Sequence, residues 1–381
     1  MSKLVFYGVV ILIILNLSMF FIILVNKVKN NRKIDIFNKK KASYLNMIDQ
    51  TIKGEGDGIT RPVNSTELEA LKEALLYSFD YYGQTYYDAL KTICREAGIV
   101  KEEIKGLSNP QVLRRATAAY SLGVMRAEES LQFLLKIKSQ DPVLLQTVHR
   151  AVLQIGGKKY IDFVLSSTDI SETQQKIRVM ELFTEVEGDI FEEMLLYLEG
   201  DDLFKKALAL EVLGRRKESR VKPYIISNLS SIHKELRISA LKAANSFRCC
   251  ECDDSQFPLE QLTVDESWEV RSFCAKLLSY SENASDKVLK ALTILLKDPN
   301  WNVRFNASES LFLLGERGIE VLAESLNSED RFAREKAYDV LHREWTLFDL
   351  EKKLKSYSNG EKIRDSIIQF QNRSKEEDAI V

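Results

Sequence analysis

Cysteines and carboxylates crowd together at one place in the sequence, where the chain reads CCECDD from Cys249 to Asp254. Thiolates and carboxylates are zinc ligands, and a structural zinc site takes four of them. No second pair with suitable spacing and no nearby histidine completes such a set alongside Cys249, Cys250 and Cys252. We therefore expect a loop of reduced thiols between two helices, with a metal or redox site as the alternative.

Histidine and glycine motifs add no catalytic candidate. The three histidines are His149, His233 and His342, and none has H-E-x-x-H or H-x-x-E-H spacing. The segment GEGDG, Gly54 to Gly58, follows no strand and opens no helix, so we interpret it as a flexible linker and not as a phosphate loop. The sequence thus predicts no catalytic residue, no cofactor, no metal and no evident small-molecule substrate.

The composition suits a helical protein in a reducing compartment. The chain has 381 residues, of which 45% are hydrophobic, and only 16 Gly and 6 Pro, which fits helices joined by short turns. The net charge of -2 gives no indication of nucleic-acid binding. Five cysteines, an odd number, would make a poor disulfide framework.

One stretch recurs along most of the chain. Asp298 to Gly315 (DPNWNVRFNASESLFLLG) repeats the pattern of Asp265 to Ser281 (DESWEVRSFCAKLLSYS), about 33 residues upstream. Aligning the arginines of the two stretches extends the frame to eight anchor positions, spaced roughly 28 to 34 residues apart, as in helical repeats. The anchors are Arg115, Val148, Lys176, Lys206, Arg237, Arg271, Arg304 and Arg334.

The residues around each anchor have helical spacing. A compact residue stands three places after each anchor, and a large apolar residue stands seven places after most of them. Such positions share one face of an α-helix and allow neighbouring helices to interlock. A second apolar segment follows each anchor helix, so the sequence predicts α–α hairpins stacked into an all-α solenoid. Left-handed C-caps are expected at Gly123, Gly156, Gly214 and Gly315.

The repeat pattern resembles HEAT repeats, in particular the short bacterial type of about 30 residues. The likeness is carried by WEVR (268–271), WNVR (301–304), LRRATAAYSLG (113–123), and an Asp or Asn six places before the anchor, at Asp265, Asp298 and Asn109. In HEAT proteins such Asp and Arg residues commonly hydrogen-bond between adjacent repeats, so the resemblance implies a structural ladder. The resemblance covers roughly residues 67–341, and the ladder is expected to break at Val148.

The N-terminal segment from Leu4 to Val25 has no charged residue over about 22 positions, enough to span a bilayer core of roughly 30 Å. A cleaved signal peptide is the alternative, although its apolar region should be shorter. Lysines and arginines follow the segment at Lys27, Lys29, Arg32, Lys33, Lys39, Lys40 and Lys41. By the positive-inside rule they place the N-terminus outside and the repeats in the cytoplasm. We interpret the cluster as fixing this orientation, with contact to anionic headgroups as the alternative.

These features divide the chain into five predicted parts. They are a transmembrane anchor (1–26), a basic juxtamembrane segment with a Gly-rich linker (27–63), N-terminal capping helices (64–108), HEAT-like repeats (109–357), and a C-terminal capping helix with a disordered tail (358–381). Asn64 and Glu67 have capping-box spacing, so a helix should begin there. A closing helix is expected from Glu361 to Gln371, shielding the last repeat from water.

Exposed aromatic residues are the candidates for partner contact. Tyrosines crowd the end of the first helical pair, where a packed cap and a protein-binding patch are both open, and tyrosine and tryptophan are enriched in binding hot spots. The candidate residues are Tyr81, Tyr82, Tyr86, Tyr87 and Trp345.

With its N-terminal span, the chain resembles bacterial membrane-anchored HEAT proteins, some of which are encoded beside membrane glycosyltransferases. The resemblance implies a single-pass protein of the cell membrane that acts as a scaffold for a membrane-associated protein partner. It does not imply an enzyme. The alternative is a HEAT-like enzyme of lyase or isomerase type, for which no acid, base or nucleophile pair stands out in the sequence.

Overall fold

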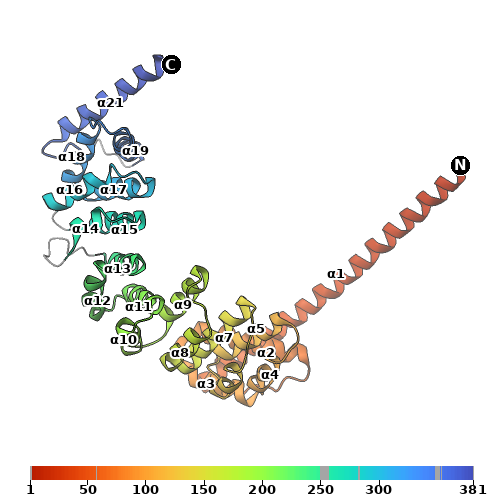
Figure 1. Cartoon of the computed structure of the whole chain (residues 1–381). Coiled ribbons are helices and arrows are strands. Elements are labelled where there is room, and N and C mark those ends of the chain that lie inside the picture. Colours follow the sequence, from red (N-terminus) through yellow and green to blue (C-terminus); the bar gives the residue numbers. More distant parts are fainter. Residues whose placement is uncertain are drawn as a thin grey trace. The chain divides into compact units, whose positions relative to one another are not determined.

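The structure is a computed structural model that describes residues 2–56, 58–248, 257–281, 284–347, 352 and 354–380, without the side chains of residues 2–6, 9–14, 84, 344–347 and 373–380. Every regular element among these residues is a helix, as the repeat pattern predicts. The helices form two compact units, unit 1 from Met1 to Asp162 and unit 2 from Phe163 to Val381 (Figure 1). Each unit is described by itself below.

Unit 1 begins with one unbroken helix, α1 (Ser2–Ile52), whose last turns pack against α2 (Ser65–Tyr82). Tyr44 and Ile48 of α1 are buried. Two ion pairs fasten the same stretch to α2, with Lys40 Nζ 2.8 Å from Glu67 Oε1 and Lys41 Nζ 2.9 Å from Glu73 Oε2. The segment interpreted as a flexible linker, including Gly54, therefore connects two helices that are packed on each other.

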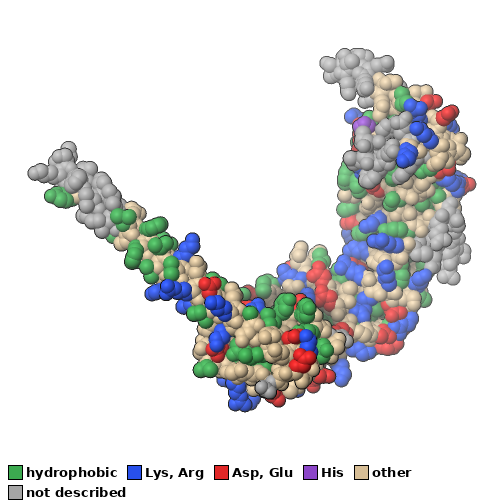
Figure 2. Space-filling view, turned by 180° about the vertical axis from the view of Figure 1, so that it is seen from behind, with side chains coloured by type: hydrophobic (Ala, Val, Ile, Leu, Met, Phe, Trp, Pro, Cys, Tyr) green, Lys and Arg blue, Asp and Glu red, His purple; other side chains and the backbone are tan. Residues whose placement is uncertain are grey.

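The described side chains in the N-terminal half of α1 are largely exposed. Large apolar residues from Leu15 to Leu24 are exposed at nearly every position, and lysine and arginine side chains follow them nearer to the rest of unit 1 (Figure 2). Among the residues that the structure describes, no helix is both long enough and apolar enough to cross a membrane. Residues 4–6 and 9–14 of the predicted span, 4–25, lie outside the described side chains.

The rest of unit 1 consists of short helices that pack onto α2 and onto one another. Their bounds are α3 (Tyr87–Glu96), α4 (Ile99–Gly106), α5 (Val112–Val124), α6 (Leu131–Leu134) and α7 (Pro142–Gly156), and α8 (Ile161–Ser166) crosses the boundary with unit 2. The predicted N-terminus of α2 is confirmed, because Asn64 Oδ1 accepts a hydrogen bond from the Glu67 backbone N at 3.0 Å. Glu67 Oε2 in turn accepts from the backbone N of Val63 at 3.0 Å.

Unit 2 stacks helical pairs in chain order (Figure 1). After α9 (Thr173–Glu185) the pairs are α10 (Phe191–Glu199) with α11 (Leu203–Arg215), α12 (Lys222–Leu229) with α13 (Lys234–Phe247), α14 (Leu259–Thr263) with α15 (Trp268–Leu278), α16 (Asp286–Leu295) with α17 (Trp301–Leu313), and α18 (Glu316–Ser325) with α19 (Arg331–Leu347). The second helices, which carry the anchors, contact one another in sequence from α11 to α19 and form one layer. The first helices contact one another from α14 to α18 in a second layer.

A final helix, α21 (Gly360–Ile380), packs on α18 and buries Ile363 and Ile367. It therefore covers the last pair, as predicted for a closing helix, and it extends further than the predicted range of 361–371. Ser358 also hydrogen-bonds to the carboxylate of Glu316, which ties the connection before α21 to the start of α18.

Two of the predicted C-cap glycines have a different role. Gly123 and Gly214 lie inside α5 and α11, and a Cβ atom added there would sit 2.9 Å from Ala151 Cα and 2.6 Å from Ala243 Cα, respectively. Because real Cβ atoms do not approach other atoms so closely, these glycines allow adjacent anchor helices to touch. Of the four, only Gly315 has a positive φ, 73°.

Candidate interaction surfaces

An arginine ladder joins successive pairs in the C-terminal part of unit 2. Arg237 Nη2 donates to Asp265 Oδ1 at 2.9 Å, and Arg271 donates to both oxygens of Asp298 at 2.6 and 3.0 Å. Each aspartate belongs to the pair that follows its arginine. Asp298 raises the pKa of Arg271, because the hydrogen-bonded carboxylate stabilises the charged guanidinium. This is the ladder implied by the resemblance, and it is confirmed at these two rungs.

Four anchor arginines, including the two of the ladder, also bind the loops that precede their own helices. The Nη1 atom of each one donates to the carbonyl oxygen six places earlier, at 2.6 to 2.9 Å, in the pairs Arg237–Ser231, Arg271–Asp265, Arg304–Asp298 and Arg334–Ser328. A guanidinium has five N–H donors in a fixed fork, so one side chain can hold its own loop and the next pair together. These hydrogen bonds explain why an arginine recurs at the same position of successive repeats.

The ladder stops where the acidic partner is missing. The position that would pair with Arg304 is Ser328, and the guanidinium instead lies over the Phe332 ring at 4.6 Å. Within the described residues, neither Arg304 nor Arg115 in unit 1 forms an ion pair with an acid, whereas Arg237 and Arg271 do. Val148, the next anchor after Arg115, is completely buried. The predicted break at Val148 is consistent with these contacts.

A buried carboxylate in unit 2 was not predicted from the sequence. Glu211 lies in α11, where eight consecutive residues from Ala207 to Gly214 are buried. Its Oε1 is 2.7 Å from Lys176 Nζ and accepts from Ser239 Oγ at 2.6 Å, while its Oε2 is 3.6 Å from Lys242 Nζ. Burial alone would raise the pKa of Glu211, but the two lysines and the Ser239 hydroxyl hold it below its ordinary value. The signal available in the sequence was a charge inside the apolar run LALEVLG.

The predicted tyrosine patch divides into outward and inward residues. Tyr81 is exposed, and its ring lies 6.0 Å from that of Tyr77 and 5.0 Å from that of Tyr82. Tyr86 makes an edge contact with Tyr82 at 5.7 Å. Tyr87 points inward, with its ring 4.9 Å from Phe79 and its hydroxyl hydrogen-bonded to the backbone oxygen of Val124. The cluster therefore contains both a packed cap and an exposed edge.

Tyr82 connects the tyrosine cluster to α1. Its hydroxyl donates to Asp49 Oδ1, and this hydrogen bond raises the pKa of Tyr82 to about 12 because the carboxylate favours the protonated phenol. The side chain is consequently committed to fastening α1 on α2. The remaining candidate, Trp345, lies outside the described side chains.

A second aromatic surface lies on the exposed side of α15, α17 and α19, and we call it the anchor-helix face. Trp268, Trp301 and Phe332 are 40%, 52% and 54% exposed near the starts of successive anchor helices. Trp301 stacks on Phe305 at 5.1 Å, and Lys336 of α19 lies 4.9 Å above the Trp301 ring. These contacts hold the Trp301 ring between α17 and α19. The sequence analysis used both tryptophans only as repeat signatures.

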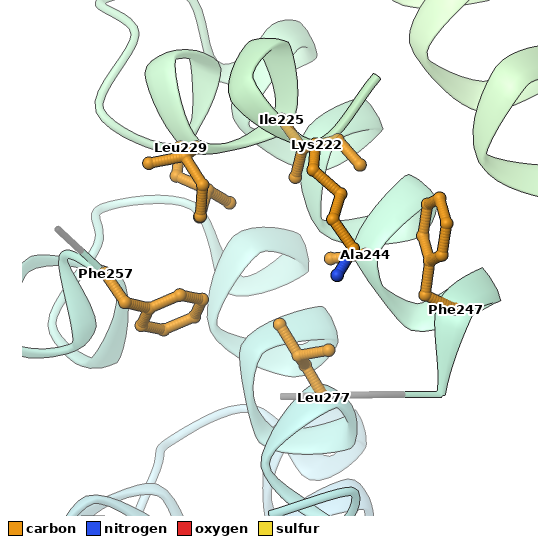
Figure 3. A pocket seen from close by; sticks show the side chains of 8 residues that line it. Lys222, Ile225, Leu229, Ala244, Phe247, Phe257 and Leu277 are labelled. Atoms are coloured by element: carbon orange, nitrogen blue, oxygen red, sulfur yellow. The ribbon is translucent and has the colours of Figure 1, made fainter. Parts of the chain in front are cut away.

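One small pocket lies between α12, α13 and α15 in unit 2 (Figure 3). Its volume is about 40 Å³, and the lining side chains include Ile225, Leu229, Phe247 and Leu277, with Lys222 as the single cation. Apart from Lys222 the lining is apolar, and it offers no paired acid and base.

The described cysteines are poor nucleophiles and poor metal ligands. Cys94 and Cys274 are buried, and burial raises the pKa of each thiol to about 12. No group of three or more His, Cys, Asp or Glu residues that could hold a metal occurs in the described part of the chain. Cys249, Cys250 and Cys252 lie outside it, so their predicted role as free loop thiols stays a prediction.

The stacked pairs and their ladder define an all-helical repeat protein. Residues 255–342, which begin shortly before α14 and end within α19, match a family model described as HEAT repeats. This part of the chain is thus similar to HEAT repeats in sequence as well as in its helical pairing. No curated protein matches the chain.

Two solved structures illustrate the comparison with known folds. A crystal structure described as an engineered protein is 17% identical, with a TM-score of 0.35, over 81% of this chain and 96% of that one. A crystal structure of a Kap121p mutant is 12% identical, with a TM-score of 0.43, over 87% of this chain. The match spans 38% of the length of that Kap121p chain.

Proposed function

We propose that this chain is a membrane-tethered scaffold that holds a protein partner on the anchor-helix face of unit 2. The observation that carries the proposal is the series of half-exposed aromatic rings at Trp268, Trp301 and Phe332, one on each of the three successive anchor helices α15, α17 and α19. Aromatic side chains held rigidly at a surface supply large contact area at little cost in conformational entropy. The exposed edge of the tyrosine cluster at Tyr81 is a second, separate contact surface.

The tether in this proposal is the N-terminal half of α1. From Leu4 to Val25 the sequence has no charged residue, and the large apolar side chains described from Leu15 to Leu24 are exposed. A helix that is apolar all round is stable when it is surrounded by apolar material, as in a bilayer. A membrane-associated partner, for which the resemblance suggests a glycosyltransferase, would then share the same membrane.

Site-specific photo-crosslinking in intact cells tests the scaffold. A photoreactive amino acid at Asn302, exposed on the anchor-helix face, should capture one defined membrane-complex protein, while the same probe at Lys290, exposed on α16, should not. Trp301→Ala should reduce the capture from Asn302 without changing the fold, because the Trp301 side chain is half exposed. Equal capture from both positions, or none from either, would refute the assignment of this face.

No specific contact among the described residues favours the alternative of a lyase or isomerase. The buried Glu211 is paired with two lysines, and it is not among the residues that line the described pocket. A general acid or base must reach its substrate within hydrogen-bonding distance. We therefore retain the scaffold as the single proposed function.

A further inference from the structure

The basic residues that follow the apolar half of α1 fall into two groups. Lys40 and Lys41 are occupied by the carboxylates of Glu67 and Glu73 on α2. Lys27, Lys29, Arg32, Lys33 and Lys39 are exposed, and within the described residues none of them forms an ion pair. The two groups are contiguous in sequence, but only the second is available to a partner.

We propose that Lys27, Lys29, Arg32 and Lys33 form a binding surface for the headgroups of anionic lipids. The inference rests on the proposed membrane tether and adds a lipid class to it. It assigns these four residues a role distinct from that of Lys40 and Lys41, which clamp α1 to α2.

Charge complementarity identifies the partner. Between residues 26 and 41 the only acidic residue is Asp35, against seven lysines and arginines. This strongly basic segment begins directly after the apolar residues that end at Val25. A partner that contacts both segments must therefore present an apolar region next to a negatively charged layer. A bilayer containing anionic lipids has this arrangement, whereas a nucleic acid supplies only the negative charge.

The continuity of α1 sets a distance limit on the surface. At 1.5 Å per residue, Lys33 lies about 12 Å along the helix from Val25, and Lys39 about 21 Å from it. The potential of a charged membrane decays over a Debye length of about 8 to 10 Å at physiological salt. Lys27 and Lys29 should therefore interact with headgroups most strongly, Arg32 and Lys33 less, and Lys39 hardly at all.

The full-length chain, reconstituted into vesicles, provides the test. Spin-labelled phosphatidylglycerol and phosphatidylcholine would be compared for their association with the protein by electron paramagnetic resonance. The wild-type chain should select phosphatidylglycerol, by up to about five-fold for each cation close to the surface. Replacing Lys27, Lys29, Arg32 and Lys33 by glutamine together should remove most of that selectivity. Lys39→Gln, an exposed lysine on the same helix, is the matched control and should leave the selectivity nearly unchanged.

Flotation with vesicles separates this inference from the tether itself. Incorporation into phosphatidylcholine vesicles that resists an alkaline wash supports the tether, and absence of lipid selectivity in that sample overturns the headgroup surface alone. Salt-sensitive binding to phosphatidylglycerol vesicles only, lost in the four-residue variant, would refute the tether and support the surface. No association with either vesicle would overturn both.

The control variant tests the distance limit. An equal loss of selectivity with Lys39→Gln would overturn the distance limit and with it the assignment to these four residues.

Discussion

The two units solve the same packing problem in different ways. In unit 1, α5 and α7 meet where Gly123 faces Ala151, and the anchor Val148 is a buried aliphatic residue. In unit 2, α11 and α13 meet in a similar manner where Gly214 faces Ala243. Unit 2 adds charged contacts between successive pairs, which unit 1 lacks at Val148. Close contact between helices is thus the common requirement, and the ladder is an addition to it.

Each rung of the ladder makes one arginine depend on one acid of the following pair. Replacing a buried ion pair with apolar residues is often neutral, whereas removing one partner leaves an uncompensated buried charge. Arg271 therefore favours only a neighbour that carries an acid where Asp298 stands. We infer that each rung restricts which pair can follow it, and the following predictions compare the ladder with the packing that both units share.

The largest effect is expected when one rung of the ladder is cut. Asp298→Ala removes the acceptor of two hydrogen bonds from Arg271 and should destabilise unit 2 by about 3 to 5 kcal/mol. Urea unfolding followed by tryptophan fluorescence measures it, because all three tryptophans of the chain belong to unit 2. Asp286→Ala, which breaks the exposed pair with Arg317, is the control and should cost about 1 kcal/mol or less. Equal losses in the two variants would contradict the role of the ladder.

Acid should act on the two units in different pH ranges. Burial lowers the pKa of His149 in unit 1 from 6.5 to about 4, so the unfolded state binds more protons between these values. Unit 1 should therefore lose about 3 kcal/mol of stability as the pH falls from 6.5 to 4, and no more from this residue below that. The folded pKa of Glu211 in unit 2 is lowered, so its contribution is present above the unfolded value near 4.5 and disappears only as the pH falls through the lower folded value.

Hydrogen exchange, read by mass spectrometry on peptides from α7 and α11, resolves the two pH ranges. His149→Gln should abolish the pH dependence of the protection factors of the α7 peptides between pH 6.5 and 4. The protection factors of the α11 peptides should not change. If the α7 peptides keep the same dependence in this variant, His149 is not its source.

The smallest effect is expected at the contact that both units share. A Cβ atom at position 214 would lie 2.6 Å from Ala243 Cα, and one at position 123 would lie 2.9 Å from Ala151 Cα. Gly214→Ala and Gly123→Ala should each cost about 1 to 3 kcal/mol through overpacking, with the larger loss at Gly214. Thermal unfolding measures both. Adding Ala243→Gly or Ala151→Gly removes the facing Cβ atom, at 2.7 or 3.0 Å, and should recover part of the loss, while the contact with the Cα atom stays. A larger loss at Gly123 than at Gly214 would contradict the assigned contacts.

The repeat register could be predicted from the sequence because it follows from local periodicity. The arginine anchors Arg237, Arg271, Arg304 and Arg334 all occupy equivalent positions, and the first three lie beside charged or aromatic groups of the following pair. Their spacing of about one repeat is visible in the chain without any knowledge of contacts. The ladder followed from resemblance to a family with the same spacing.

Other features could not be predicted because they depend on contacts between distant residues. Lys176 and Glu211 are 35 positions apart, and nothing in their local sequence pairs them. Gly123 and Gly214 stand where a helix would end by sequence alone, but the approach of the neighbouring helix gives them their role. The sequence does not show that Lys336 of α19 lies above the Trp301 ring of α17, which is one of the contacts that define the anchor-helix face.

Because α1 is unbroken, its length fixes how the other helices of unit 1 are rotated around its axis relative to its N-terminal half. Because its last turns are clamped to α2, deleting one residue between positions 26 and 39 would turn unit 1 by about 100° around the helix axis. Deleting seven residues would restore nearly the original facing and bring unit 1 about 10 Å closer to the start of the helix. The number of residues in this segment thus decides which side of unit 1 points in a given direction around the axis of α1.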